Sequence, residues 1–362
     1  MRARALVGAL AITLGAGAFG GCNAVLAIPD PTLALHVTCT DGACVCDPGF
    51  DDCDGRRGDD CATDLSSDPR HCGACGHDCL GGGCKEGRCL PVVLATIEGA
   101  TGLSLRDGEL YVGTCDGSGK GDAFRKLTVD GGTPVTAVRS DHCGAAQVIL
   151  GDRLYWGDDT TLLATQLATP SPPRVVTTGA SPRKIVASDT HVYWGQLDAM
   201  GDDVGVMRLT LATGVKEHVY STPTYGITAD ADGVYWGGDE GVFGLPNGSS
   251  TPLLINPIST YDLQLDAKSF YIGTTDGIYT LPRKGGALTL LVPGARGPCL
   301  VTDATTLFWL DNATSSVNQV PLAGGAPTVL ATEVSVHGTA AIAVDATAVY
   351  WLSGTVVARV AR

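Results

Sequence analysis

The sequence predicts an all-β chain in which a seven-bladed β-propeller follows a small disulfide-rich module. The first observation is a short motif, Val192-Tyr193-Trp194-Gly195, whose near-copies recur along the last three quarters of the chain. The second is the glycine content, 49 of 362 residues, which fits many turns and argues against a helical fold. The third is a group of ten cysteines within residues 39–89. The aromatic residue of the motif marks seven repeats: Tyr111, Tyr155, Tyr193, Tyr235, Tyr271, Phe308 and Tyr350.

The spacing of these repeats predicts the propeller. Successive aromatic marks lie 44, 38, 42, 36, 37 and 42 residues apart, and strand-rich repeats near forty residues are typical of propeller blades. Glycine pairs recur at one turn of the repeat, where a tight hairpin needs a positive φ: Gly131-Gly132, Gly285-Gly286 and Gly324-Gly325. The third repeat divides into four expected strands, here called A to D: Lys184–Ser188, Val192–Gly195, Gly205–Leu211 and Val215–Tyr220.

Residues 90–362 are expected to form the ring. The last repeat stops after its third strand, Val356–Val360, whereas a spare strand, Pro91–Thr96, precedes the first repeat. We therefore expect Pro91–Thr96 to complete the seventh blade, an N-terminal strand that closes the ring like velcro and limits exposed strand edges.

The motif itself is expected to be scaffold. Neighbouring residues of a strand face opposite ways, so Tyr193 and Trp194 can each pack against a different neighbouring blade. All five tryptophans of the chain lie in copies of this motif. An aspartate also recurs at the A-to-B turn of every repeat, where its side chain can accept backbone N–H groups in an Asx turn. These aspartates are Asp107, Asp152, Asp189, Asp230, Asp266, Asp303 and Asp345.

The motif and its preceding aspartate resemble the YWTD and NHL types of propeller. They also resemble propeller domains of bacterial lipoproteins. The resemblance covers about three quarters of the chain and implies the same propeller fold.

The first residues are expected to direct export. Arg2 and Arg4 precede an apolar run, and Gly20-Gly21-Cys22 follows it, which predicts a signal peptide over residues 1–21. The segment around Cys22 resembles a bacterial lipobox, which implies that Cys22 is lipidated and that residues 22–38 link an acyl anchor to the folded chain. The predicted location is the bacterial cell envelope, on the outer membrane or surface, with the lipid bilayer as a partner. The alternative is an ordinary signal peptide that leaves Cys22 to form a disulfide.

The cysteine-rich segment, residues 39–89, is expected to be held together by disulfides. An exported chain meets an oxidising compartment, and so short a segment with few large apolar residues needs covalent cross-links. A further disulfide is expected between Cys115 and Cys143, and Cys299 is expected to be a buried thiol. The ten cysteines of the segment are Cys39, Cys44, Cys46, Cys53, Cys61, Cys72, Cys75, Cys79, Cys84 and Cys89.

Two family resemblances lie in this segment. Cys44 to Cys53 resembles the end of an EGF-like module, and Asp68 to Cys79 resembles the stigma-specific-protein type of cysteine-rich module. Both imply an extracellular location. A zinc site built on Cys72, Cys75 and Cys79 is the alternative to disulfides, and residues 52–60 could form half of a calcium loop. We expect neither metal.

Function is expected in the loops that lead into strand A and join strand B to strand C, because these loops differ between repeats. They share one rim of the ring, which we call the upper rim. The A-to-B and C-to-D turns form the lower rim. Candidate ligand-binding residues on the upper rim are His142, Arg183, Tyr225, Tyr261, Arg296 and His337.

The expected function is binding of a protein, peptide or glycan, with no cofactor. A net charge of −14 without a basic stripe argues against a nucleic-acid partner. The usual sequence motifs of catalysis are missing. The alternative is a propeller enzyme, a lyase or hydrolase resembling the streptogramin lyases, with His142 and His337 as acid and base.

Overall fold

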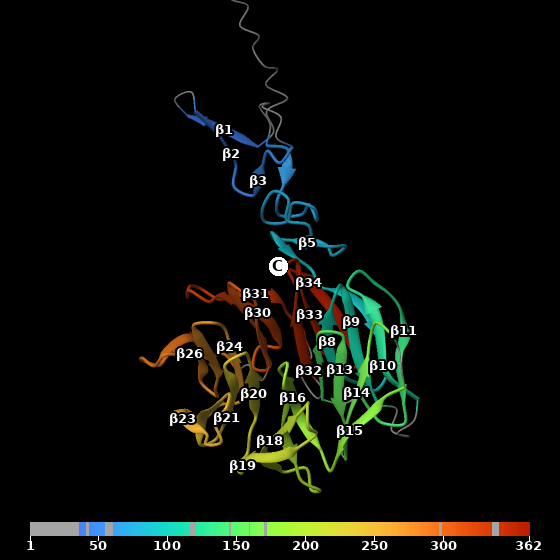
Figure 1. Cartoon of the computed structure of the whole chain (residues 1–362). Coiled ribbons are helices and arrows are strands. Elements are labelled where there is room, and N and C mark those ends of the chain that lie inside the picture. Colours follow the sequence, from blue (N-terminus) through green and yellow to red (C-terminus); the bar gives the residue numbers. More distant parts are fainter. Residues whose placement is uncertain are drawn as a thin grey trace, which may run out of the picture.

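A computed structural model describes residues 36–40, 43–54, 61–115, 121–144, 146–158, 160–169, 172–296, 299–334 and 340–362. These residues form strands and turns, and they contain no helix that could span a membrane. Seven four-stranded sheets are arranged in a ring, and three two-stranded sheets precede it (Figure 1). The predicted all-β seven-bladed propeller is therefore confirmed.

Each blade is an antiparallel meander in which consecutive strands pair. Blades 1 to 3 comprise β8 (Ala100–Arg106), β9 (Glu109–Thr114), β10 (Gly121–Thr128) and β11 (Gly131–Ser140); β12 (Gln147–Leu150), β13 (Arg153–Gly157), β14 (Thr161–Gln166) and β15 (Arg174–Thr178); and β16 (Pro182–Ala187), β17 (His191–Leu197), β18 (Asp203–Thr210) and β19 (Lys216–Tyr220). Blades 4 to 6 comprise β20 (Gly226–Ala229), β21 (Gly233–Gly238), β22 (Gly241–Pro246) and β23 (Leu253–Asn256); β24 (Asp262–Leu265), β25 (Ser269–Gly273), β26 (Gly277–Pro282) and β27 (Thr289–Pro293); and β28 (Cys299–Thr302), β29 (Thr306–Asp311), β30 (Ser316–Pro321) and β31 (Thr328–Ala331). Blade 7 comprises β32 (Ala340–Val344), β33 (Ala348–Ser353), β34 (Val356–Ala361) and β7 (Val92–Thr96).

Blade 7 is closed by the N-terminal strand, as predicted. β7 pairs antiparallel with β34, in a register that places Thr96 opposite Val356 and Val92 opposite Arg359. β34 runs from the upper to the lower rim, so the chain enters β7 from the lower rim.

The core lies between blades and confirms the scaffold role of the motif. Trp194 is fully buried and packs toward blade 2, in a cluster with Tyr155 and Leu162. Tyr193, 2% exposed, packs toward blade 4, in a cluster with Val234 and Trp236. In the other copies of the motif that carry a tryptophan, the tryptophan and the aromatic residue before it also pack toward opposite neighbouring blades, because side chains alternate along the strand.

The glycine pairs of the C-to-D turns have positive φ, as the hairpin prediction requires. At Gly285-Gly286, for example, φ is 87° and 147°.

The aspartates of the A-to-B turns correct one expectation. In blades 4 to 7 the aspartate comes first in a four-residue turn and its Oδ1 accepts two backbone N–H groups, as Asp266 does from Lys268 and Ser269 at 2.7 Å each. In blades 1 and 2 the turn has only two residues, so Asp107 and Asp152 lie within it. In blade 3 Ser188 comes first, and its Oγ accepts the N–H of His191 at 3.2 Å. The expectation of seven Asx turns was therefore wrong for blades 1 to 3. The turns of blades 1 and 2 are too short, and in blade 3 the first position of the four-residue turn is a serine, with Asp189 second.

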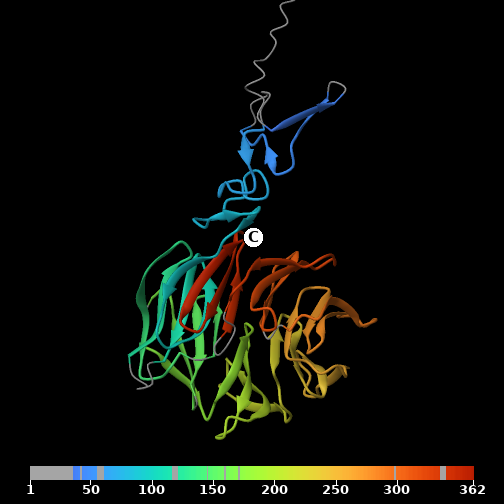
Figure 2. The ribbon, with the colours of Figure 1, turned by 180° about the vertical axis from the view of Figure 1, so that it is seen from behind.

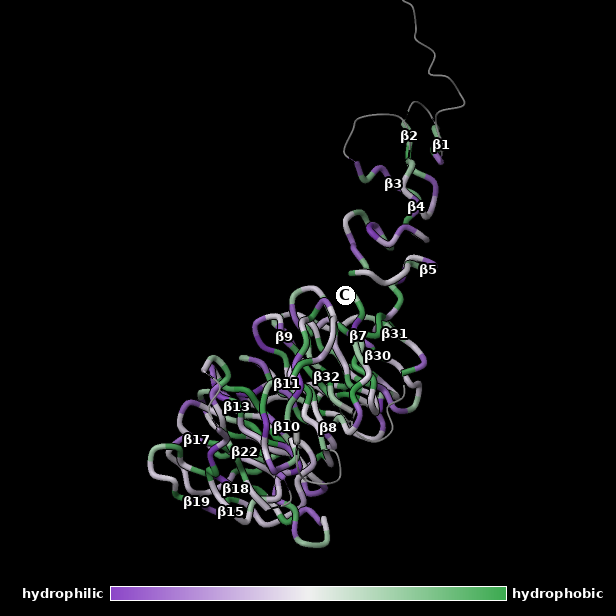
Figure 3. Tube along the Cα trace, turned by 90° about the vertical axis from the view of Figure 1, so that its right-hand side faces the viewer, coloured by the Kyte–Doolittle hydropathy of each residue, from purple (hydrophilic) through white to green (hydrophobic). Residues whose placement is uncertain are grey.

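The cysteine-rich module contains β1 (Val37–Thr40), β2 (Ala43–Cys46), β3 (Phe50–Asp51), β4 (Thr63–Asp64), β5 (Cys84–Lys85) and β6 (Arg88–Cys89). Few strongly hydrophobic stretches line its path (Figure 3). Five disulfides cross-link it: Cys39–Cys44, Cys46–Cys61, Cys53–Cys75, Cys72–Cys84 and Cys79–Cys89. Twelve cysteines in disulfides, counting Cys115–Cys143 in the propeller, indicate a protein exported to an oxidising compartment.

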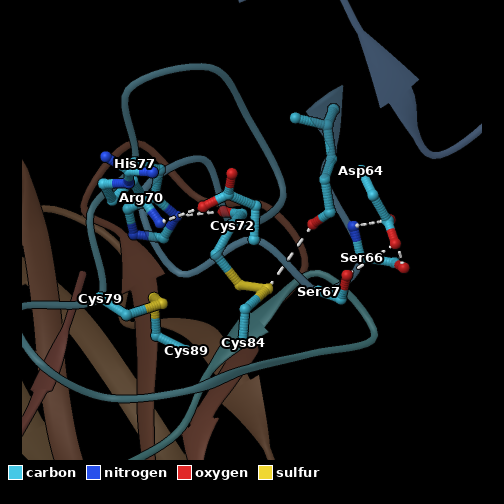
Figure 4. The surroundings of a disulfide bond; sticks show 11 residues. Asp64, Ser66, Ser67, Arg70, Cys72, His77, Cys79, Cys84 and Cys89 are labelled. Atoms are coloured by element: carbon cyan, nitrogen blue, oxygen red, sulfur yellow. Dashed lines mark hydrogen bonds between the residues drawn. A yellow bond between two sulfur atoms is a disulfide. The ribbon is translucent and has the colours of Figure 1, made fainter. Parts of the chain in front are cut away.

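The disulfides occupy the sulfur atoms that a zinc site would need. Cys72, Cys79 and Cys89 bring their sulfurs within 4.8 Å of one another, but each is oxidised (Figure 4). His77 Nδ1 lies 2.5 Å from the backbone oxygen of Cys72, so it orders the loop. Residues 55–60 of the candidate calcium loop lie outside the described residues.

The module joins the ring at blade 7, on the lower rim, beside the C-terminal end of the chain (Figures 1 and 2). The guanidinium of Arg359, 8% exposed, forms the joint. It donates to the backbone oxygen of Leu80 in the module and to that of Val129 in blade 1. It also pairs with Asp130 at 3.2 Å. One side chain thus ties the module, the closing blade and the first blade together.

Candidate functional site

Three of the predicted rim residues occupy the same position in consecutive blades. Arg183, Tyr225 and Tyr261 each stand at the upper end of strand A, two residues before the residue paired with the tryptophan position of strand B. The paired residues are Ile185 with Trp194, Ile227 with Trp236, and Leu263 with Ile272. The repeat therefore aligns the three side chains in a row around one side of the central channel.

The three side chains stack into a ladder. The guanidinium carbon of Arg183 lies 5.1 Å from the ring centroid of Tyr225, and the rings of Tyr225 and Tyr261 are 5.8 Å apart with an interplanar angle of 12°. The hydroxyl of Tyr225 donates to Asp239 at 2.9 Å, which raises the pKa of this tyrosine. Tyr225 therefore contacts both Arg183 and Tyr261 and is also held at its hydroxyl. Tyr261, 45% exposed, ends the ladder with an open surface.

An ion pair lies one residue further along strand A. Lys184 of blade 3 donates from Nζ to Asp262 Oδ1 of blade 5 at 2.6 Å. Blade 4 has Gly226 at this position, and a Cβ there would lie 2.7 Å from the backbone nitrogen of Leu263. The missing side chain lets blades 4 and 5 approach closely and lets Lys184 reach across. The other oxygen of Asp262 accepts the N–H of Leu300 in blade 6 at 2.8 Å.

Cys299 takes this position in blade 6. Burial raises the pKa of its thiol to about 12, and the charge of Asp262 acts in the same direction. The thiol is therefore protonated at neutral pH and is a poor nucleophile.

Asp203, at the start of β18, supplies a buried carboxylate beside the ladder. Its side chain is 3% exposed, and its Oδ2 lies 3.9 Å from the nearest guanidinium nitrogen of Arg183. Oδ1 accepts the N–H of Gly205 at 3.2 Å, but Oδ2 is buried with no hydrogen-bond partner among the described residues. Desolvation raises the pKa of Asp203, although hydrogen bonds from the backbones of Gly205 and Thr224 and the charge of Arg183 act in the opposite direction. This oxygen is therefore buried beside a half-exposed cation.

The other predicted rim residues are not brought into this cluster. His142 Nδ1 contacts Asp158 Oδ2, and the Cys115–Cys143 disulfide adjoins it in the chain. A shallow groove between blades 1 and 2 passes His142. Arg296 is exposed, and its backbone N–H donates to Asp311 at 3.3 Å. His337 lies outside the described residues.

Sequence reasoning missed Asp203, Lys184, Gly226 and Asp262. Aligning the repeats on the tryptophan position would have exposed the last three, since Lys184, Gly226, Asp262 and Cys299 then form one column that has no common residue type. Asp203 leaves no such signal, because only the fold places it near Arg183.

Comparisons with known proteins support the fold. No family model and no curated protein matches the chain. Among solved structures, virginiamycin B lyase from Staphylococcus aureus aligns with a TM-score of 0.59 at 10% identity, over 75% of this chain and 98% of that one. The extracellular domain of the putative one-component system BT4673 from B. thetaiotaomicron aligns with a TM-score of 0.55 at 13% identity, over 74% of this chain and 39% of that one. The computationally designed protein Ika8 has a TM-score of 0.52 at 12% identity, over 75% and 99%.

At such identities the likeness concerns the fold alone. The chain is a seven-bladed β-propeller protein with a disulfide-rich N-terminal module. These neighbours include an enzyme and a computationally designed protein, so the shared fold does not define the function of this chain.

Proposed function

We propose that this protein is a lipid-anchored protein of the bacterial cell envelope whose propeller binds a protein, peptide or glycan at its upper rim. The observation that carries the proposal is the position of the module. It joins the ring at the lower rim through Arg359, and the ladder of Arg183, Tyr225 and Tyr261 lies at the opposite rim. An anchor at Cys22, upstream of the module, then leaves the ladder accessible.

The composition of the ladder supports a binding role. Arginine and tyrosine are the residue types that most often dominate binding energy, because they combine a large flat surface with hydrogen bonding. Arg183 is 48% exposed, so part of it is available to a ligand. Its contact with Tyr225 limits the motion that binding must freeze.

Capture of partners from native envelope extract tests the binding role. We expect the full chain to retain a partner that Tyr261→Ala and Arg183→Ala lose, whereas Asp189→Ala on the lower rim retains it. Equal capture by all variants would remove the upper rim from the proposal.

The anchor has a separate test. Cys22→Ala should move the protein from the membrane fraction to the soluble fraction, and incorporation of radiolabelled fatty acid should be lost. Continued fractionation of Cys22→Ala with membranes would exclude an anchor at this residue.

A second function, a lyase or hydrolase at the upper rim, is favoured by the contact between His142 and Asp158. A carboxylate on Nδ1 orients the imidazole and leaves Nε2 to act on a substrate. Virginiamycin B is the first compound to test, because a structural neighbour acts on it. Turnover lost in His142→Ala and retained in His218→Ala, a change on the outer strand of blade 3, would replace the pure binding role with catalysis.

A further inference from the structure

We propose that the cleft between blades 2 and 3, at the lower rim, is a second binding site, which takes a carboxylate attached to a small apolar group. The carboxylate pairs with Arg153 and Arg174, and the apolar group fills a cavity beside Ala164. The site lies at the rim opposite the ladder, so it does not depend on the proposed function.

One row of side chains on blade 2 forms a wall of this cleft. Tyr155 of β13 pairs with Ala164 of β14, which pairs with Arg174 of β15. Directly paired residues of antiparallel strands project from the same face of a sheet. This face is turned toward blade 3, because Tyr155 and Ala164 belong to a buried cluster with Leu209 of that blade. Arg153 lies two residues before Tyr155 in β13, so its side chain belongs to the same face.

A small residue in the middle of the row leaves the cleft partly open. The same position in blades 3 and 7 holds a long side chain, Arg208 and Arg359. Arg208 pairs with Glu217 of the next strand at 2.6 Å, and Arg359 reaches the backbone oxygen of Val129 in the adjacent blade. Blade 2 has Ala164 here, and a cavity of about 250 Å³ remains between blades 2 and 3.

Two arginines that line this cavity lack an acidic partner. Arg153 Nη1 donates to the hydroxyl of Tyr155 at 3.3 Å, which leaves other N–H groups of the guanidinium available. Among the described residues, neither Arg153 nor Arg174 forms an ion pair, and the nearby Asp152 is paired with Arg106 of blade 1 at 2.8 Å. Two cations therefore line one cavity without a paired carboxylate, in a chain whose net charge is −14.

Two other clefts of the ring show what is missing here. The residue that follows strand C is an arginine in blades 5 and 7, Arg283 and Arg362. Arg283 pairs with Asp230 of blade 4 at 2.5 Å, and Arg362 pairs with Asp303 of blade 6. Each arginine thus crosses a cleft to a carboxylate of the preceding blade. Blade 3 has Leu211 at this position, so the cleft between blades 2 and 3 has its arginines on blade 2, and a ligand can supply the carboxylate.

The walls and charges of the cavity select the ligand. A guanidinium matches the two oxygens of a carboxylate in a bidentate pair. Tyr155 and Leu209 line the cavity and favour an apolar group on the ligand. Asp152 and Asp189 line the adjoining groove at the lower rim and oppose a more highly charged anion such as phosphate. A volume of about 250 Å³ lies below the roughly 300–1,000 Å³ of sites for drug-sized ligands, so the bound group is about the size of one amino-acid side chain.

Such a group occurs in a free short-chain acid and at the C-terminus of a peptide, and the test separates these two sources. Saturation-transfer NMR of the full chain in detergent measures binding of 4-methylpentanoate, its amide, inorganic phosphate, and acetylalanylleucine with a free or an amidated C-terminus. We expect saturable binding of at least one of the two carboxylates and none of its amide. Binding of 4-methylpentanoate alone would identify a free acid as the ligand, and preferential binding of the peptide acid would identify a peptide C-terminus.

Variants test the place of the site. Arg153→Gln and Arg174→Gln should each weaken binding at least about fivefold, because each removes one guanidinium. Ala164→Leu should abolish binding by filling the cavity. The matched controls are Lys268→Gln, an exposed lysine in the A-to-B turn of blade 5, and Gln319→Leu, at the position of Ala164 in blade 6; both should bind as the wild type does. Thermal unfolding checks that each variant is folded.

Absence of binding of both carboxylates overturns the proposal, as does equal binding of their amides or tighter binding of inorganic phosphate. Binding that Arg153→Gln, Arg174→Gln and Ala164→Leu all leave unchanged overturns the site. These outcomes are separate from failure of the proposed function, because Arg183→Ala and Tyr261→Ala, at the opposite rim, should not change this binding.

Discussion

Lys184 Nζ donates to Asp262 Oδ1 at 2.6 Å, although the two residues belong to blades 3 and 5. Propeller blades normally contact only their neighbours, and here the blade between contributes Gly226, which has no side chain. Because Asp262 also accepts the N–H of Leu300 in blade 6, one carboxylate links blades 3, 5 and 6 next to the ladder.

Lys184→Met should destabilise the protein by about 3 kcal/mol, since it leaves the Asp262 charge, with 3% of its side chain exposed, without its cation. Denaturant unfolding measures the change. Adding Asp262→Asn should restore at least half of the loss. Lys216→Met, which removes an exposed lysine bound to the Thr178 backbone, is the control and should cost under about 0.5 kcal/mol. A double variant as unstable as the single one would contradict the ion-pair explanation.

Gly226→Ala should be destabilising by about 2 kcal/mol or more, because the new Cβ would lie 2.7 Å from Leu263 N and 2.8 Å from Asp262 Cα. Gly195→Ala is the matched control, since the atom nearest to a Cβ there, among the described residues, would be the Thr224 backbone oxygen at 3.5 Å, an ordinary contact. Thermal unfolding compares the two. Equal melting temperatures would show that blades 4 and 5 can separate at this point without cost.

Asp203→Asn should stabilise the ligand-free protein at pH 7 by roughly 1–2 kcal/mol, because it removes a buried charge with an unsatisfied oxygen. Burial raises the pKa of Asp203 in the folded state. The wild type therefore loses stability as pH rises from the ordinary aspartate pKa of 3.8 through the raised value. The advantage of the variant should accordingly shrink below pH 3.8. Unfolding measured against pH tests this, and an advantage that is independent of pH would argue against a charge effect.

Asp345→Ala should cost about 1 kcal/mol at pH 7, through loss of the turn that Asp345 Oδ1 closes by accepting the N–H groups of Thr347 and Ala348. Burial alone would raise the pKa of Asp345, but these bonds and that from Tyr350 outweigh it and lower the pKa. The stabilisation is present above the ordinary pKa of 3.8 and is lost as pH falls through the lowered value. The difference between wild type and variant should therefore vanish in acid, as chemical unfolding between pH 7 and pH 2 would show. Asp189→Ala should cost little at any pH.

Arg359→Met should destabilise the joint between module and ring by about 1–3 kcal/mol, because the partly buried backbone oxygens of Leu80 and Val129 lose their donor. We expect a protease to cleave the variant faster between the module and β7, and gel electrophoresis of timed samples measures the cleavage rate. Arg174→Met, an exposed arginine on the outer strand of blade 2, should cleave at the wild-type rate. An unchanged rate for Arg359→Met would mean that packing and disulfides hold the joint without this residue.

Much of the fold could be predicted because it depends on local repetition. The burial of Tyr193 and Trp194 on opposite faces follows from strand alternation, and the closing strand, β7, follows from one missing and one spare strand. The Asx turns predicted for the two shorter turns do not form, because a recurring aspartate does not reveal how many residues separate two paired strands. Asp107 and Asp152 show this, since each lies inside a two-residue turn.

The sequence by itself determined the number of blades and the closure, and it predicted Arg183, Tyr225 and Tyr261 among six candidates on the upper rim, because each depends on position in the repeat. Only the tertiary structure decided that Lys184 reaches Asp262 and that Asp203 lies beside Arg183 with a buried oxygen. Lys184 and Asp262 hold the same position of the repeat in blades that are not neighbours, whereas Asp203 and Arg183 hold different positions in one blade. Both contacts therefore depend on how the curvature of the ring and the approach of neighbouring blades position the side chains. The repeat specifies the scaffold, whereas the residues that differ between repeats come together at the upper rim only once the ring has closed.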